Sequence, residues 1–173
     1  LREVKGLHKG RTQARESTPV LLGDEATIQA TLRHLPPIVA DMVRLQRLTG
    51  CRPEEICLIR PFDVDCIGDV WAYRPESHKT VHHGRERIIF IGPKGQDILR
   101  PYLLREKTAY CFCPAESERK RREAAHERRV TALHYGNRPG ANKSSKPKRP
   151  AGARDTTASY RRAIHRACET AFA

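Results

Sequence analysis

Residues 48–58, LTGCRPEEICL, continued by IRPFDVD over residues 59–65, form the stretch of sequence that decides the fold. Before this stretch, apolar side chains recur every three or four residues, which predicts a helix with a broad buried face. That apolar set is Ile38, Val39, Met42, Val43, Leu45 and Leu48. Gly50 is suited to end this helix, and Pro53 to occupy the first turn of the next. The stretch therefore predicts two helices joined by a tight turn, with Arg52 at the start of the second.

Towards the N-terminus, the sequence predicts a helix through Ala26, Ile28 and Leu32 that ends at Pro36-Pro37. Asp24 can cap it, and Glu25 in its first turn complements the helix dipole. Residues 1–16 are basic and rich in turn-forming residues. They are expected to be a linker from a preceding domain, and residues 17–173 are expected to form one further domain.

Towards the C-terminus, three short β-prone runs follow the second of the two helices. Phe62, Val64 and Cys66 alternate with aspartates, and a second run, residues 70–73, comes after the turn at residues 68–69. A third run over residues 87–91 ends at Gly92-Pro93, and residues 96–104 have helical spacing. The predicted fold class is α+β, mainly α-helical with a small three-stranded antiparallel sheet.

Composition favours a nucleic-acid partner. The 173 residues are enough for one core, and 38% of them are hydrophobic. The net charge is +13, and a field of this sign attracts polyanions. Residues 117–154 alone hold twelve Lys/Arg against three Glu, so they are expected to be a basic, flexible insert, with helix for residues 116–130. Order is expected to resume in a helix over residues 159–172 that Thr156-Thr157 cap.

Other classes of protein fit less well. No apolar run reaches the roughly 18 residues that a membrane span needs, and LREVK at residues 1–5 has no signal-peptide core. We expect a soluble, cytoplasmic protein associated with the nucleoid. The six cysteines are expected to be reduced. A weaker alternative is a zinc-stabilised domain that uses Cys111 and Cys113 with His126 or His134.

The 48–58 stretch resembles the T-G-x-R-x-x-E box of the tyrosine recombinases, the phage-integrase family. In that family the arginine binds the scissile DNA phosphate and the acid braces the active site, so the resemblance assigns these roles to Arg52 and Glu55. A guanidinium is suited to the first role because it is planar, donates in pairs and stays charged. The alternative is an ordinary surface pair at i,i+3, worth a few tenths of a kcal/mol.

Residues 77–93, SHKTVHHGRERIIFIGP, resemble the family's β-hairpin. In the family the hairpin lysine protonates the departing 5′ oxygen of DNA, and Lys79 matches it in order and distance. General-acid catalysis of this kind typically contributes about 10²–10⁴-fold in rate. His82, His83 and Arg85 are expected to contact DNA from the same turn. The alternative for Lys79 is a solvated lysine that binds backbone phosphate.

Three further family features have no match in a fitting context: an H-x-x-R box, a later His or Trp, and a tyrosine nucleophile. HERR at residues 126–129 and HHGR at residues 82–85 spell the box but lack its apolar helix. Tyr160 is expected to be a core residue. The resemblance therefore implies a C-terminally incomplete catalytic domain that is inactive alone.

The intact protein is accordingly expected to be a site-specific recombinase or integrase. Its tyrosine would attack a phosphodiester, giving a 3′-phosphotyrosyl link and a free 5′ hydroxyl, without metal or other cofactor. Its expected partners are double-stranded DNA and further recombinase protomers in a synaptic assembly. The alternative function is that of a non-catalytic, basic nucleic-acid-binding module.

Overall fold

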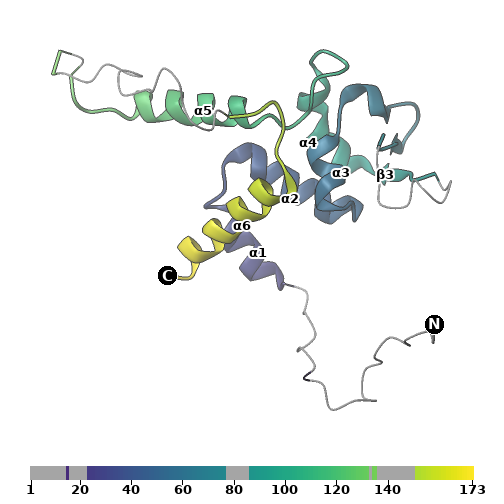
Figure 1. The fold of residues 1–173 in the computed structure, drawn as a ribbon, viewed down its shortest axis with the longest axis horizontal. Coiled ribbons are helices and arrows are strands. Elements are labelled where there is room, and N and C mark those ends of the chain that lie inside the picture. Colours follow the sequence, from purple (N-terminus) through teal and green to yellow (C-terminus); the bar gives the residue numbers. More distant parts are fainter. Residues whose placement is uncertain (1–14, 16–22, 77–85, 133, 136–150) are drawn as a thin grey trace, which may run out of the picture.

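The computed structural model describes residues 15, 23–76, 86–132, 134–135 and 151–173, which are mostly helical with a small sheet (Figure 1). Its helices are α1 (Glu25–Leu32), α2 (Pro37–Thr49), α3 (Pro53–Leu58), α4 (Pro93–Leu103), α5 (Pro114–Glu127) and α6 (Thr157–Ala171). A 3-10 turn, η1 (Pro61–Asp63), precedes the strands β1 (Val64–Asp65), β2 (Trp71–Tyr73) and β3 (Ile89–Ile91). The predicted fold class, mainly helical α+β with a three-stranded antiparallel sheet, is confirmed.

The sheet has the order β1-β2-β3 with antiparallel neighbours. Trp71 lies opposite Ile91 and Tyr73 opposite Ile89, and all four are buried. Phe90 points to the other face and is exposed. One face of the sheet therefore belongs to the core, as period-two alternation requires.

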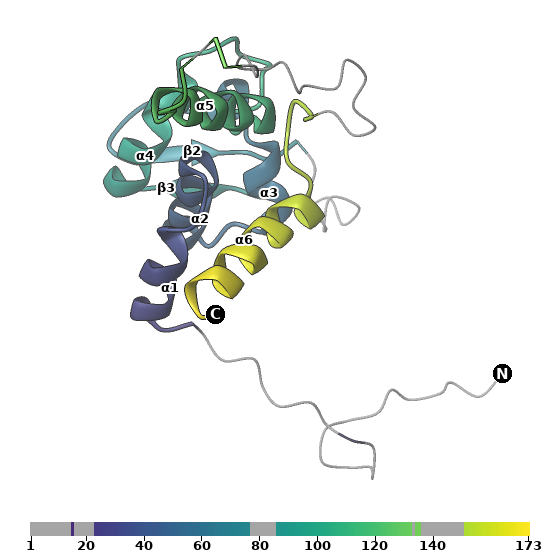
Figure 2. The same ribbon diagram turned by 90° about the vertical axis from the view of Figure 1, so that its left-hand side faces the viewer.

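The core lies around α2, whose Met42 and Leu45 are almost fully buried. α4 packs against α2 and contributes Leu99, while α1 packs along α6 (Figure 2). Tyr160 and Ala167 of α6 complete this side of the core. Helices from both ends of the described chain thus enclose the α2–α3 junction.

Several predicted boundaries are confirmed by their capping contacts. The backbone N–H of Thr27 donates to Asp24 Oδ1 at 2.8 Å, so Asp24 caps α1. Gly50 ends α2 with a left-handed φ of 63°. Thr156 caps α6 by accepting a hydrogen bond from the Ser159 N–H at 3.1 Å.

Two details of the prediction are wrong. Phe62 belongs to η1 rather than to a strand and is 73% exposed, because Pro61 starts a 3-10 turn there. α4 begins at Pro93, three residues before the predicted start, because Pro93 occupies its first turn. Gly95 follows in the same turn, where an added Cβ would lie 2.9 Å from Ile91 Cγ2.

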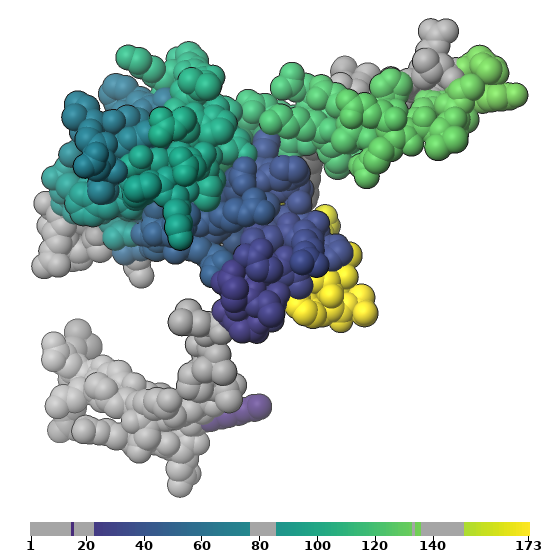
Figure 3. All heavy atoms as spheres, turned by 180° about the vertical axis from the view of Figure 1, so that it is seen from behind, coloured from purple at the N-terminus to yellow at the C-terminus, as the bar shows by residue number. Residues whose placement is uncertain are grey.

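α5 stands out from the rest of the described chain (Figure 3). None of its residues is buried, and its charged side chains pair locally, as when Glu118 accepts from Arg121 and Arg122 at 2.7 Å. Within the described part of the predicted basic insert, this helix therefore adds nothing to the core. No helix in the described ranges is both long and apolar enough to cross a membrane.

Candidate functional site

The α2–α3 turn presents Arg52 at the surface. The left-handed Gly50 reverses the chain, and the buried Cys51 anchors it before Arg52 becomes the N-cap of α3. The Arg52 side chain is 43% exposed. Its backbone N–H donates to Glu55 Oε2 at 2.7 Å, the contact by which the third helical residue of a capping box accepts from the N-cap. The backbone at Arg52 is therefore fixed while its guanidinium remains accessible.

Glu55 lies beneath this turn as a buried carboxylate, with only 2% of its side chain exposed. Arg87 binds it through two parallel hydrogen bonds, Nε to Oε1 at 2.9 Å and Nη2 to Oε2 at 3.1 Å. Arg52 Nη1 lies 3.6 Å from Oε1, which is within ion-pair range but too long for a hydrogen bond. The alternative of an ordinary surface pair is wrong, because Glu55 is inside the protein.

The pKa of Glu55 reflects two opposing effects. Burial raises the pKa. The hydrogen bonds from Arg87 and from the Arg52 N–H, together with the charges of both guanidinium groups, lower the pKa by more than burial raises it. The net pKa lies below the ordinary value, so the carboxylate is ionised at neutral pH. Two guanidinium groups around one carboxylate leave one positive charge, and the exposed Arg52 carries it.

A hydrogen bond connects Glu55 to the sheet. The Tyr73 hydroxyl, on β2, donates to the backbone carbonyl of Glu55 at 2.8 Å and is buried. Burial raises the pKa of Tyr73 strongly, so the phenol remains a donor. Arg87 approaches from just before β3, so α3, β2 and the start of β3 converge on Glu55.

Arg87 was missed by the sequence analysis although a signal for it exists. Residues 87, 89 and 91 alternate along the third predicted β-prone run, and Ile89 and Ile91 face the core. Side chains at i, i+2 and i+4 of a strand share a face, so Arg87 was due to point inward. A half-buried arginine that points inward favours a carboxylate partner, and Glu55 supplies it.

Four predicted site residues, Lys79, His82, His83 and Arg85, lie outside the described residues. The structure therefore brings together Arg52, Glu55 and the unpredicted Arg87. Of the sequence HERR at residues 126–129, His126 and Glu127 end the exposed helix α5, which lacks the apolar setting expected of an active-site box.

The prediction that Tyr160 is a core residue is confirmed. Its side chain is buried, and its hydroxyl donates to Gln46 Oε1 at 2.8 Å. Gln46 Nε2 in turn donates to the carbonyl of Cys51 at 3.1 Å. Tyr160 is therefore connected through Gln46 to the turn before Arg52. Burial raises the pKa of Tyr160, so the phenol is favoured over the phenolate.

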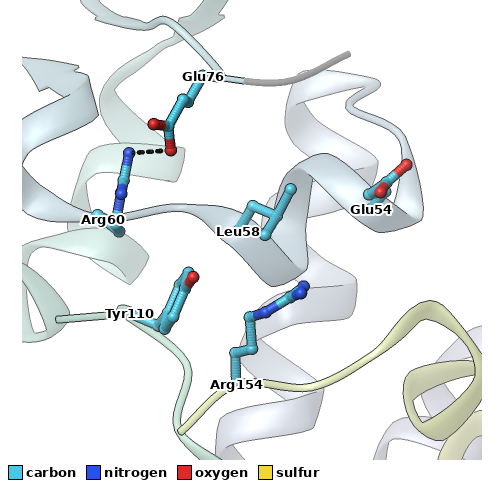
Figure 4. Close-up of a pocket in the computed structure, with 6 residues that line it drawn as sticks. All are labelled: Glu54, Leu58, Arg60, Glu76, Tyr110 and Arg154. Atoms are coloured by element: carbon cyan, nitrogen blue, oxygen red, sulfur yellow. Dashed lines mark hydrogen bonds and ion pairs between the residues drawn. The ribbon is translucent and has the colours of Figure 1, made fainter. Parts of the chain in front are cut away.

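A pocket of about 230 Å³ lies beside α3 (Figure 4), and Arg52, Glu55 and Arg87 are not among the residues that line it. Its lining residues are Glu54, Leu58, Arg60, Glu76, Tyr110 and Arg154. Arg60 Nη2 binds Glu76 at 2.8 Å, and the Arg154 guanidinium lies 5.6 Å from the Tyr110 ring centre. The charges of two acidic and two basic side chains cancel, so the lining of this pocket lacks the net positive charge found at Arg52.

The cysteines and histidines that suggested zinc are not gathered into a site. Cys111 is fully buried in the core, and Cys113 Sγ approaches the carbonyl of Gly152 at 3.9 Å. Over the described ranges, no three His, Cys, Asp or Glu side chains are grouped so that they could hold a metal ion.

Comparisons of the chain with protein-family models, with curated proteins and with solved structures found no match. The function must therefore be argued from the chemistry of the Arg52, Glu55 and Arg87 cluster and from the charge of the whole chain.

Proposed function

We propose that this chain is the DNA-binding part of the catalytic domain of a tyrosine-recombinase-like enzyme, in which Arg52 binds the phosphate at the cleavage point. The observation that carries the proposal is the exposed guanidinium of Arg52 above a buried carboxylate that a second arginine already binds. A guanidinium held in this way can donate to two non-bridging phosphate oxygens. It would stabilise the negative charge that grows on these oxygens during attack.

In the proposed reaction, a tyrosine hydroxyl attacks the phosphorus and forms a 3′-phosphotyrosyl bond. The 5′ oxygen leaves with a proton, for which Lys79 is the proposed donor, and the reverse step joins a partner strand. His82, His83 and Arg85 are proposed DNA contacts, and further protomers the proposed partners in the synaptic assembly. The buried Tyr160 is excluded as nucleophile because its hydroxyl is already bound to Gln46.

The proposed phosphate contact is tested by the salt dependence of duplex DNA binding. Each phosphate neutralised by a cation contributes about 0.9 to the slope of log affinity against log salt. Arg52→Gln should reduce this slope by about one. Arg44→Gln is the matched control, because Arg44 is 45% exposed and also pairs with an i,i+3 acid, Asp41. Equal slopes for Arg52→Gln and the wild-type chain would contradict the proposal.

The covalent step is tested with a nicked duplex from which the cleaved strand end diffuses away. A form of the protein that includes the expected H-x-x-R box and tyrosine should accumulate a denaturant-resistant protein–DNA adduct. Arg52→Ala should reduce this adduct at least tenfold, since losing one transition-state donor costs about 10²–10³ in rate. An undiminished adduct would remove Arg52 from the mechanism.

A second candidate, the non-catalytic nucleic-acid-binding module, is favoured by α6. Its Arg161, Arg162 and Arg166 side chains are exposed and, within the described part of the chain, form neither hydrogen bonds nor ion pairs. A module that binds through charge alone would lose similar affinity from Arg162→Gln and Arg52→Gln. The recombinase proposal instead expects the larger loss from Arg52→Gln.

A further inference from the structure

We propose that Arg87 is a positioning residue that keeps Glu55 occupied, so that the Arg52 guanidinium stays free to bind phosphate. This inference rests on the proposed function, because it names what sets the geometry of the same site. Arg87 itself lies below the surface position of Arg52, with 31% of its side chain exposed against 43%.

The hydrogen bonds of Glu55 show how Arg87 and Arg52 compete for one carboxylate. Oε2 accepts from the Arg52 backbone N–H at 2.7 Å and from Arg87 Nη2 at 3.1 Å. Oε1 accepts from Arg87 Nε at 2.9 Å, while Arg52 Nη1 stays at 3.6 Å. Without Arg87, Oε1 would lose its hydrogen bond, and the Arg52 guanidinium is the adjacent donor. It would then turn inward to the carboxylate instead of outward to DNA.

The charge at the site leads to the same conclusion. With Arg87 present, the cluster of Arg52, Glu55 and Arg87 has a net charge of +1, which attracts phosphate. Without Arg87, Glu55 neutralises Arg52 and the net charge falls to zero. Among the described residues, the buried Cys51 thiol lies near Glu55 and the Tyr73 hydroxyl donates to its backbone carbonyl, but both groups are neutral and cannot replace the lost cation.

Arg87 also links two parts of the predicted site through the backbone. It comes two residues after residues 77–85, which carry Lys79, and two residues before the start of strand β3. Its pairing with Glu55 fixes the point at which the chain enters β3 relative to the start of α3.

The inference is tested by a double-mutant cycle on duplex DNA affinity with the whole chain. Arg52→Gln should weaken binding about tenfold in the wild-type background, the effect expected for a charged hydrogen bond. In the Arg87→Gln background the same substitution should change affinity less than about twofold. In the Arg87→Lys background the effect should be intermediate, because an ammonium keeps the charge but not the paired donors.

A spectroscopic readout separates positioning from mere stability. The side-chain carboxyl of Glu55, followed by carbon NMR, should titrate at clearly higher pH in Arg87→Gln than in the wild-type chain. Arg105→Gln is the matched control, because Arg105 also binds a glutamate, Glu116, through two contacts of 3.1 and 3.3 Å. It should lower stability without changing the tenfold effect of Arg52→Gln. If Arg87→Gln does not fold, Arg87→Lys completes the cycle.

The outcomes distinguish the two proposals. No loss of affinity from Arg52→Gln in the wild-type background would overturn the proposed function. A tenfold loss that persists unchanged in Arg87→Gln and Arg87→Lys would leave that function intact and overturn the role of Arg87. If the affinity loss caused by Arg52→Gln shrinks as much in the Arg105→Gln background as in the Arg87→Gln background, the proposed role of Arg87 is also overturned.

Discussion

Glu55 is a single buried charge that determines how the surface above it is arranged. Its carboxylate accepts hydrogen bonds from the backbone at residue 52 and from the side chain at residue 87, which are far apart in sequence. A buried carboxylate without such partners would take up a proton. Because both partners are present, the charge is retained and Arg52 is held at the surface.

Removing either partner of the buried pair should be costly. Arg87→Ala should lower the free energy of unfolding by about 1–3 kcal/mol, because Arg52 can replace only part of the two charge-assisted hydrogen bonds that Glu55 loses. Glu55→Ala should cost a similar amount, because it leaves the half-buried Arg87 without its carboxylate. Urea denaturation followed by circular dichroism measures this change. Arg44→Ala, which removes an exposed ion pair, should cost less than about 1 kcal/mol. Equal losses at the two sites would contradict the described burial of Glu55.

Acid should weaken the fold through the same carboxylate. The pKa of Glu55 is lower in the folded protein than its ordinary value of 4.5, so its ionised form favours folding. This contribution is complete above about pH 4.5 and is lost as the pH falls through the lower, folded pKa. Glu55→Gln should therefore show a shallower loss of stability below pH 4.5 than the wild-type chain. Parallel curves would show that folding does not lower the pKa of Glu55.

At the scale of secondary-structure elements, the turn between α2 and α3 depends on one glycine. Gly50 has φ of 63°, and an added Cβ would meet nothing within 4 Å. The cost of a side chain there is thus conformational, and Gly50→Ala should lower the free energy of unfolding by about 1–2 kcal/mol. Gly50→Asn should recover most of it, since asparagine tolerates this conformation. An equal loss for both variants in urea denaturation would contradict the explanation.

Local signals in the sequence were sufficient to predict most elements. Asp24 and Gly50 mark helix ends through backbone chemistry that acts over a few residues, and the alternation in β2 and β3 marks a sheet with one buried face. The start of α4 was missed because Pro93 was taken as the end of a strand rather than the first turn of a helix. Phe62 was misplaced because its apolar character fits a strand, whereas the chain at Pro61 forms a turn.

The candidate site was harder to predict because it depends on contacts between distant segments. The T-G-x-R-x-x-E pattern identified Arg52 and Glu55, which are three residues apart. It gave no sign that Glu55 is buried, since that depends on β2 and on the chain before β3. Arg87 was overlooked for the same reason, although its alternation with the buried Ile89 and Ile91 predicts an inward-facing side chain.

At the scale of the whole molecule, we expect residues 117–150 to be dispensable for the stability of the core. Residues 117–150 contain eleven Lys/Arg and three Glu, and the described helix in this stretch buries nothing. The flanking chain is already close, with Cys113 Sγ 3.9 Å from the Gly152 carbonyl. A short Gly-Ser link in place of residues 117–150 should change the free energy of unfolding by less than about 1 kcal/mol.

The same deletion should weaken DNA binding, because it removes a net charge of +8. The salt slope should fall while the relative effect of Arg52→Gln stays the same, since that contact belongs to the core. Titration of a labelled duplex at several salt concentrations measures both quantities. Loss of the Arg52 effect together with the segment would show that Arg52 does not act as an independent contact.

The central claim is that the Arg52 guanidinium binds a DNA phosphate while the Arg87 guanidinium remains on Glu55. Nitrogen–proton NMR of the arginine Nε groups tests it most directly, during titration with a duplex and with the same duplex carrying uncharged methylphosphonate links. We expect the Arg52 signal to shift with the charged duplex only and the Arg87 signal to stay in place. A bound duplex that leaves the Arg52 signal in place, or that shifts the Arg87 signal instead, would contradict the account.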